Sequence, residues 1–268
     1  METDNYKLRT TSHKPRAMKH RLQSVILLFL ILFLGCAPKK PVPEQSPSTL
    51  WSRFWRNQTQ AGLSFKIKTS INYFSARRKN RILATIWGNL NYPIRMNIEA
   101  GIGQTLSLWR EDKYLWQAYF PALKTLYFHP DGQKGATALG YPTPFNLKEL
   151  SMILLGHYSE IIPSQFDKVE FKNGLWIFSF NTMSKVKKLA LNDQARPIFL
   201  AGDVWQAKLN QYTQEQNDAY ARKIILLLPK SEQAVIRIKS LLVKETPWEK
   251  QQLALNLPGD TQKKFIKF

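Results

Sequence analysis

The sequence predicts a mainly β protein with few helices, an α+β fold in which a curved antiparallel sheet forms a half-barrel with a short helical lid. Apolar and polar residues alternate with a period of two through most of residues 63–243. About eleven such strands are expected, and a sheet of that length must curl or close. Helical patterns are few, so helices can cover only one side of the sheet.

The strands follow from this alternation. In the first of them, Phe65 and Ile67 share one face while Lys66 and Lys68 share the other. The expected strands lie near 63–73, 82–90, 94–100, 114–120, 186–191, 197–201, 203–210, 221–228 and 233–243. Asn173-Gly174, between two apolar runs, is a strong hairpin signal.

Two segments have helical patterns, residues 49–59 and residues 146–155. In the second, Asn146 can cap the N-terminus and Gly156 can end the helix. Its apolar side is formed by Leu147, Leu150, Ile153 and Leu154. We therefore expect this helix to be the apolar lid of the half-barrel.

Aromatic residues in the strands, including Trp87 and Trp116, are suited to line a dry cavity that takes acyl chains. An ordinary filled core explains the same aromatic residues equally well. The sequence leaves these two interpretations open.

The N-terminal segment has the pattern of a secretory signal. Val25 to Cys36 is an uncharged apolar run, too short to span a bilayer as a helix, and a short basic stretch precedes it. We expect residues 1–35 to be a signal peptide. Its true start is expected at Met18, with residues 1–17 as an over-extended start.

Cys36 is the only cysteine of the chain. The sequence Phe33-Leu34-Gly35-Cys36 resembles the lipobox of bacterial lipoproteins, which implies a diacylglyceryl group and an N-acyl group on Cys36 and no other cofactor. The alternative is an ordinary signal peptide with a chance cysteine. The proline-rich residues 36–48 would then be an extended tether. A single domain is expected over residues 49–268, with an extra C-terminal segment at 244–268.

The formal net charge of +20 favours anionic partners, although a solvated basic exterior explains it as well. Export and the lack of a nucleic-acid recognition motif argue against nucleic acid. His129 and His157 are too few and too scattered for a zinc site. The chain also lacks a G-x-S-x-G elbow, so we expect neither a metal site nor a catalytic site.

Four stretches of the mature chain resemble LolB, within the LolA/LolB lipoprotein-localisation superfamily. They are residues 101–106, 140–156, 191–212 and 234–242. The resemblance implies a half-barrel that holds acyl chains, a soluble LolA-like carrier as partner and lipoproteins as cargo. It also places Ile102, between Gly101 and Gly103, in a loop that inserts into the membrane. In lipoproteins the residue after the lipidated cysteine influences which membrane is reached, and the alanine at this position, Ala37, favours the outer membrane.

The resemblance thus implies a monomeric lipoprotein, anchored to the outer membrane of a Gram-negative bacterium and facing the periplasm. The alternative is a non-catalytic scaffold or interaction lipoprotein of the cell envelope that reuses this fold, because a fold does not settle function. A hydrolase acting on cell-wall or lipid substrates is a third interpretation.

Overall fold

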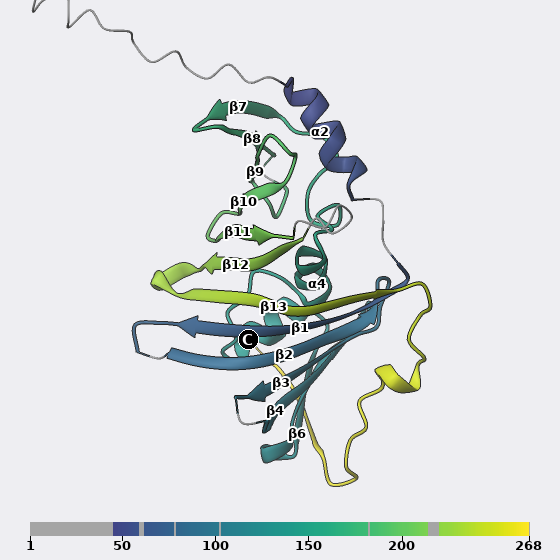
Figure 1. Cartoon of the computed structure of the whole chain (residues 1–268). Helices are drawn as coiled ribbons and strands as arrows, with labels where there is room; N and C mark the ends of the chain where they lie inside the picture. Colours follow the sequence, from purple (N-terminus) through teal and green to yellow (C-terminus); the bar gives the residue numbers. More distant parts are fainter. Residues whose placement is uncertain are drawn as a thin grey trace, which may run out of the picture. The chain divides into compact units, whose positions relative to one another are not determined.

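The computed structural model describes residues 45–58, 62–77, 79–101, 103–181, 183–213 and 220–267. These residues form one curved, open sheet of 14 strands together with three α-helices (Figure 1). The predicted mainly β fold with few helices is therefore confirmed. The signal segment, Cys36 and most of the tether lie outside the described residues, as does Ile102.

The strand order runs from one sheet edge to the other without a break. It is β14 (Gln262–Phe265), β6 (Thr125–His129), β5 (Trp116–Phe120), β4 (Thr105–Glu111), β3 (Ile94–Ala100), β2 (Lys79–Asn89), β1 (Ser64–Phe74), β13 (Gln233–Lys244), β12 (Ala221–Leu227), β11 (Gln206–Tyr212), β10 (Pro197–Ala201), β9 (Lys188–Leu191), β8 (Leu175–Ser179) and β7 (Lys168–Lys172).

All neighbouring strands are antiparallel except β14 and β6, which are parallel. The sheet is thus antiparallel as expected, apart from this one pair at its edge. Asn173 and Gly174 form the predicted hairpin between β7 and β8, with φ angles of 52° and 77°. The expected strands and helices do not include β4, β6, β14 or α3; of these, β6, β14 and α3 are short and lack a clear period.

The helices are α2 (Pro47–Arg56), α3 (Gly132–Ala138) and α4 (Leu147–Leu155), and short 3-10 turns occur at Pro121–Leu123, Pro229–Ser231 and Gln251–Leu253. Helix α2 begins two residues before its expected start because the Ser46 side chain accepts a hydrogen bond from the backbone of Thr49. Residues 47 and 48, assigned to the tether, are therefore helical. Asn146 and Glu149 form a capping box at α4, and Gly156 ends it with φ of 81°.

The concave face of the sheet carries the core. Cross-strand partners share a face, and pairs such as Ile67 with Ile86 point inward with both side chains fully buried. Helix α2 packs its aromatic side near the β7 edge of the sheet, where the ring of Trp51 lies 4.8 Å from that of Phe178 on β8. Helix α3 contacts β5 and β6, helix α4 contacts β3, and a cavity lies between this helical region and the sheet.

The C-terminal segment, residues 245–267, crosses the convex face near one end of the strands. The guanidinium of Arg110 donates to the carbonyl of Leu253 at 3.1 Å, and that of Arg95 donates to the carbonyl of Ala254. The segment then adds β14 to the edge strand β6. The sheet therefore ends at β14, a strand of only four residues, and such a short edge strand offers little backbone for pairing with other chains.

Candidate functional site

A cavity of about 690 Å³ lies on the concave face of the sheet. Strands β1 to β5, β12 and β13 form one wall, and residues from the segment 132–150 form the other. Its volume lies within the range of about 300–1,000 Å³ that is usual for ligand pockets. The core is therefore not fully filled, which favours the first of the two interpretations of the aromatic residues.

Most of the sheet wall of the cavity is apolar because one face of each strand carries aliphatic side chains. Ile82 and Ala84 of β2 face it, and so do Met96 and Ile98 of β3. The register pairs Ala84 with Ile98, which places these side chains side by side. These aliphatic side chains offer no hydrogen bonds and suit a hydrocarbon chain, whereas the ends of β1 and β2 add polar groups to the lining, those of Tyr73, Lys79, Asn80 and Arg81.

Aromatic rings form the end of the cavity nearest α3. The ring of Trp109 lies 5.0 Å from that of Trp116 and 5.0 Å from that of Tyr141, edge to face in both cases. The Trp109 indole donates to the Ser107 hydroxyl at 2.9 Å, and Ser107 also bonds the Tyr141 hydroxyl. The polar atoms of these rings are thus satisfied within the protein, and the rings present apolar surface to the cavity.

Helix α3 approaches this wall closely through two glycines. A Cβ on Gly132 would lie 2.2 Å from a carboxylate oxygen of Glu111, and a Cβ on Gly135 would lie 2.6 Å from the ring of Trp116. Only glycine allows this approach. The segment 132–143 was not predicted to belong to the site, and the two glycines after the capping residue Asp131 are the signal that could have found it.

Glu111 fixes the other wall to the sheet. Its carboxylate accepts hydrogen bonds from the backbone amides of Leu147 at 2.9 Å and Lys148 at 3.3 Å, and from the Tyr92 hydroxyl. The side chain is buried, and burial raises its pKa to about 7 against the opposing effect of these donors. The geometry is that of a cap on α4.

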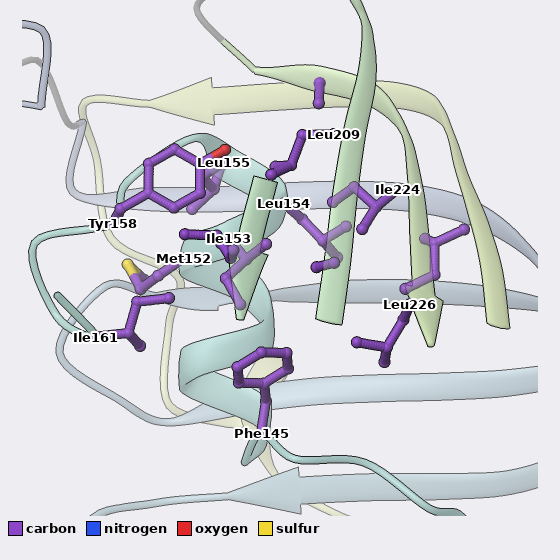
Figure 2. Packing of buried hydrophobic residues seen from close by; sticks show 14 of the residues in the cluster. Phe145, Met152, Ile153, Leu154, Leu155, Tyr158, Ile161, Leu209, Ile224 and Leu226 are labelled. Atoms are coloured by element: carbon purple, nitrogen blue, oxygen red, sulfur yellow. The ribbon is translucent and has the colours of Figure 1, made fainter. Parts of the chain in front are cut away.

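The four residues predicted as the lid separate into two groups. Leu147 and Leu150 line the cavity, as does Trp116. Ile153 and Leu154 do not line it: they are buried in the core cluster with Leu209 of β11 and Ile224 of β12, as Figure 2 shows. The first turn of α4 therefore closes the cavity, while its second half is ordinary core.

Trp87 was expected at the cavity and does not line it. It alternates with Ile86, which points inward, so Trp87 lies on the convex face. There the guanidinium of Arg95 lies 5.2 Å from the centre of its ring. A strand that is apolar on both faces gives no sign of which face is concave, and this caused the wrong assignment.

Gly101 and Gly103 lie in the turn between β3 and β4, and both are exposed. Gly103 has φ of 84°, and a Cβ at either glycine would meet no heavy atom within 4 Å. The residues before and after this turn, Ala100 and Leu106, line the cavity. The candidate insertion loop therefore stands at one end of the cavity.

The side chain of His129 has structural partners. The Nδ1 atom of His129 is 2.8 Å from the carbonyl oxygen and 3.0 Å from the backbone nitrogen of Asp131. Within the described ranges, no three His, Cys, Asp or Glu side chains are grouped so as to hold a metal ion. In the same part of the chain, no helix has the length and apolar character needed to cross a membrane.

No protein-family model matches this sequence, and no curated protein matches it either. Solved structures do share the fold. A LolA superfamily protein from Nitrosomonas europaea has a TM-score of 0.55 at 10% identity, over 79% of this chain and 98% of that chain. A domain assigned to outer membrane lipoprotein sorting, from Vibrio parahaemolyticus, has a TM-score of 0.50 at 12% identity, over 76% and 94% of the two chains.

A DUF1329 family protein from Desulfovibrio piger has a TM-score of 0.53 at 9% identity, over 80% of this chain and 100% of that chain. At such identities the likeness concerns the fold alone. The curved sheet with its few helices is therefore LolA-like.

Proposed function

We propose that this chain is an outer-membrane lipoprotein that holds acyl chains in the concave cavity and receives or inserts lipoproteins there, in the manner of LolB. The apolar cavity of about 690 Å³ is the observation that carries the proposal. The LolA-like fold supports it.

The cavity suits an acyl chain chemically. Such a chain cannot form hydrogen bonds, so any unpaired polar atom in the wall would lose its water without compensation. The indole of Trp109 and the hydroxyl of Tyr141 are both bonded to Ser107, and the aliphatic strand residues bring no polar atoms. Burial of each methylene contributes about 0.8 kcal/mol, which makes a long chain a tight ligand.

The proposed anchor is a diacylglyceryl group with an N-acyl group on Cys36, followed by the proline-rich tether. One acyl chain gives only marginal membrane binding, whereas several give a durable anchor. The domain would then face the periplasm and exchange cargo with a LolA-like carrier. This arrangement requires no cofactor beyond the covalent lipid.

The test is binding of a fluorescent fatty-acid analogue to the delipidated protein. Leu150→Glu places a carboxylate at the cavity wall and should weaken binding about tenfold or more. Leu123→Glu is the matched control, because Leu123 is 61% exposed in a turn, and it should bind as the wild type does. A wild-type protein without measurable binding would instead favour the scaffold alternative.

A further inference from the structure

Five strands that are neighbours in the sheet carry positive charge without any negative charge. In sheet order they are β2, β1, β13, β12 and β11, and together they contain ten Lys or Arg residues and no Asp or Glu. A solvated sheet surface usually mixes both signs. This concentration of one sign calls for an explanation.

Most of these cations share the convex face. Arg237 of β13 is opposite both Ser70 of β1 and Lys223 of β12, and the guanidinium of Arg81 on β2 lies 3.3 Å from the Ser70 hydroxyl. These residues form a row across four strands. Like charges directly opposite each other destabilise a sheet, so the pair of Arg237 and Lys223 has an electrostatic cost in the free protein.

Further lysines flank this row, and we define the basic face by six residues. They are Lys68, Arg81, Lys208, Lys223, Arg237 and Lys239. The five ion pairs formed within the described part of the chain involve none of them. Glu99 of the adjacent strand β3 is opposite Leu83 of β2 and so lies on the convex face, but it forms no ion pair with any of the six residues. The basic face therefore has unneutralised charge.

We propose that the basic face binds the surface of an anionic lipid bilayer. A protein partner would be expected to meet a central apolar or aromatic anchor, and protein interfaces are depleted in lysine. Here four of the six residues are lysines, and the exposed apolar residues of these strands, Leu242 and Val243, lie at the far end of β13. Dispersed lysines suit anionic head groups, which attract each basic residue without requiring a fixed geometry.

This orientation leaves the cavity accessible because the cavity lies on the opposite, concave face. Arg81 is the one member of the basic face that also lines the cavity. A bilayer on the convex side would hold the domain close to the membrane without occupying the acyl-chain site. The inference therefore goes beyond the proposed function and does not require the cavity to bind lipid.

The test is flotation of the full chain with vesicles of phosphatidylcholine alone and of an equal mixture of phosphatidylcholine and phosphatidylglycerol. A lipid anchor would contribute equally to binding of both kinds of vesicle. The ratio of the affinity for the mixed vesicles to the affinity for phosphatidylcholine vesicles therefore isolates the effect of charge. The combined variant Lys68→Gln, Lys223→Gln and Arg237→Gln should lower this ratio by about fivefold per charge removed at low salt. The wild-type preference should also weaken at high salt.

A matched control removes three exposed lysines elsewhere, with Lys134→Gln, Lys250→Gln and Lys263→Gln. It should retain most of the preference, and thermal melting should show that both variants fold. An equal loss in the control, or no preference in the wild type, overturns the proposal. So does a wild type that ignores the anionic vesicles but is retained by an acidic protein or by DNA. Both variants should bind the fatty-acid analogue as the wild type does. A wild type that fails to bind the analogue would therefore count against the proposed function and not against the basic face.

Discussion

The carboxylate of Glu111 on β4 accepts a hydrogen bond from the backbone amide of Leu147, the first residue of α4, at 2.9 Å. The two residues are 36 positions apart in the chain, so this bond joins the helical wall of the cavity to the sheet. Leu147 itself lines the cavity. The protonation state of one buried carboxyl group, that of Glu111, is thus linked to the position of the cavity wall.

The first prediction concerns the pH dependence of stability. Burial raises the pKa of Glu111 from 4.5 to about 7, so the folded state binds this proton more tightly than the unfolded state does. The contribution of Glu111 to the free energy of unfolding should therefore be largest below about pH 4.5 and fall by roughly 3 kcal/mol as the pH rises to about 7. Above that pH it should be constant.

Glu111→Gln tests this contribution because glutamine cannot ionise but keeps an acceptor oxygen. Its unfolding free energy, measured by urea denaturation across this pH window, should change less with pH than that of the wild type. The control is Glu170→Gln, which alters an exposed carboxylate on β7 and should keep the wild-type slope. Parallel profiles for wild type and Glu111→Gln would contradict the prediction.

The second prediction concerns the close contact of α3 with the aromatic wall. Gly135→Ala would place a Cβ 2.6 Å from the ring of Trp116, which is 1% exposed and has no room to move away from the helix. Overpacking of this kind costs about 1–3 kcal/mol, against a gain of about 1 kcal/mol from the better helix propensity of alanine. We expect a lower melting temperature and weaker binding of the fatty-acid analogue.

Gly259→Ala is the control for this substitution, because a Cβ there meets no heavy atom within 4 Å. Its melting temperature and probe binding should equal those of the wild type. If Gly135→Ala melts like the control, the contact between α3 and Trp116 is looser than the structure indicates.

Local patterns were sufficient to predict much of the sheet. The alternation in residues 94–100 and 197–201 gave β3 and β10 with their observed ends, and Asn173-Gly174 gave the hairpin between β7 and β8. Strand β14 could not be predicted in this way. Three of its four residues, Gln-Lys-Lys-Phe, are polar and all four are exposed, so it is a strand only because the chain returns to pair with β6.

The site was predicted in part for a similar reason. Trp116 and the first turn of α4 line the cavity as expected, because a helix with a cap and an apolar side must face the core. Glu111 and the two glycines of α3 were missed, since their roles arise from contacts between distant segments. A carboxylate in an alternating strand gives no local sign that it caps a helix 36 residues later.

The third prediction concerns the anchor. Cys36→Ala should abolish acylation and release a soluble periplasmic form with an unchanged fold, because the proposed anchor lies in the tether and not in the domain. Metabolic labelling with a radioactive fatty acid measures acylation, and fractionation of the cell envelope measures release. The wild type provides the labelled, membrane-bound reference. Label that persists in the mutant would defeat the lipobox interpretation.

The last prediction concerns Ile102, the large apolar residue between the exposed Gly101 and Gly103. We propose that Ile102 enters the acyl region of a bilayer or contacts cargo. If it does, Ile102→Glu should lose lipoprotein transfer in a reconstituted assay with little change in melting temperature. A side chain folded back into the core would respond differently: a buried charge costs several kcal/mol, so the melting temperature would fall by several degrees. Unchanged transfer by a stably folded Ile102→Glu protein would falsify the assignment of this loop to insertion.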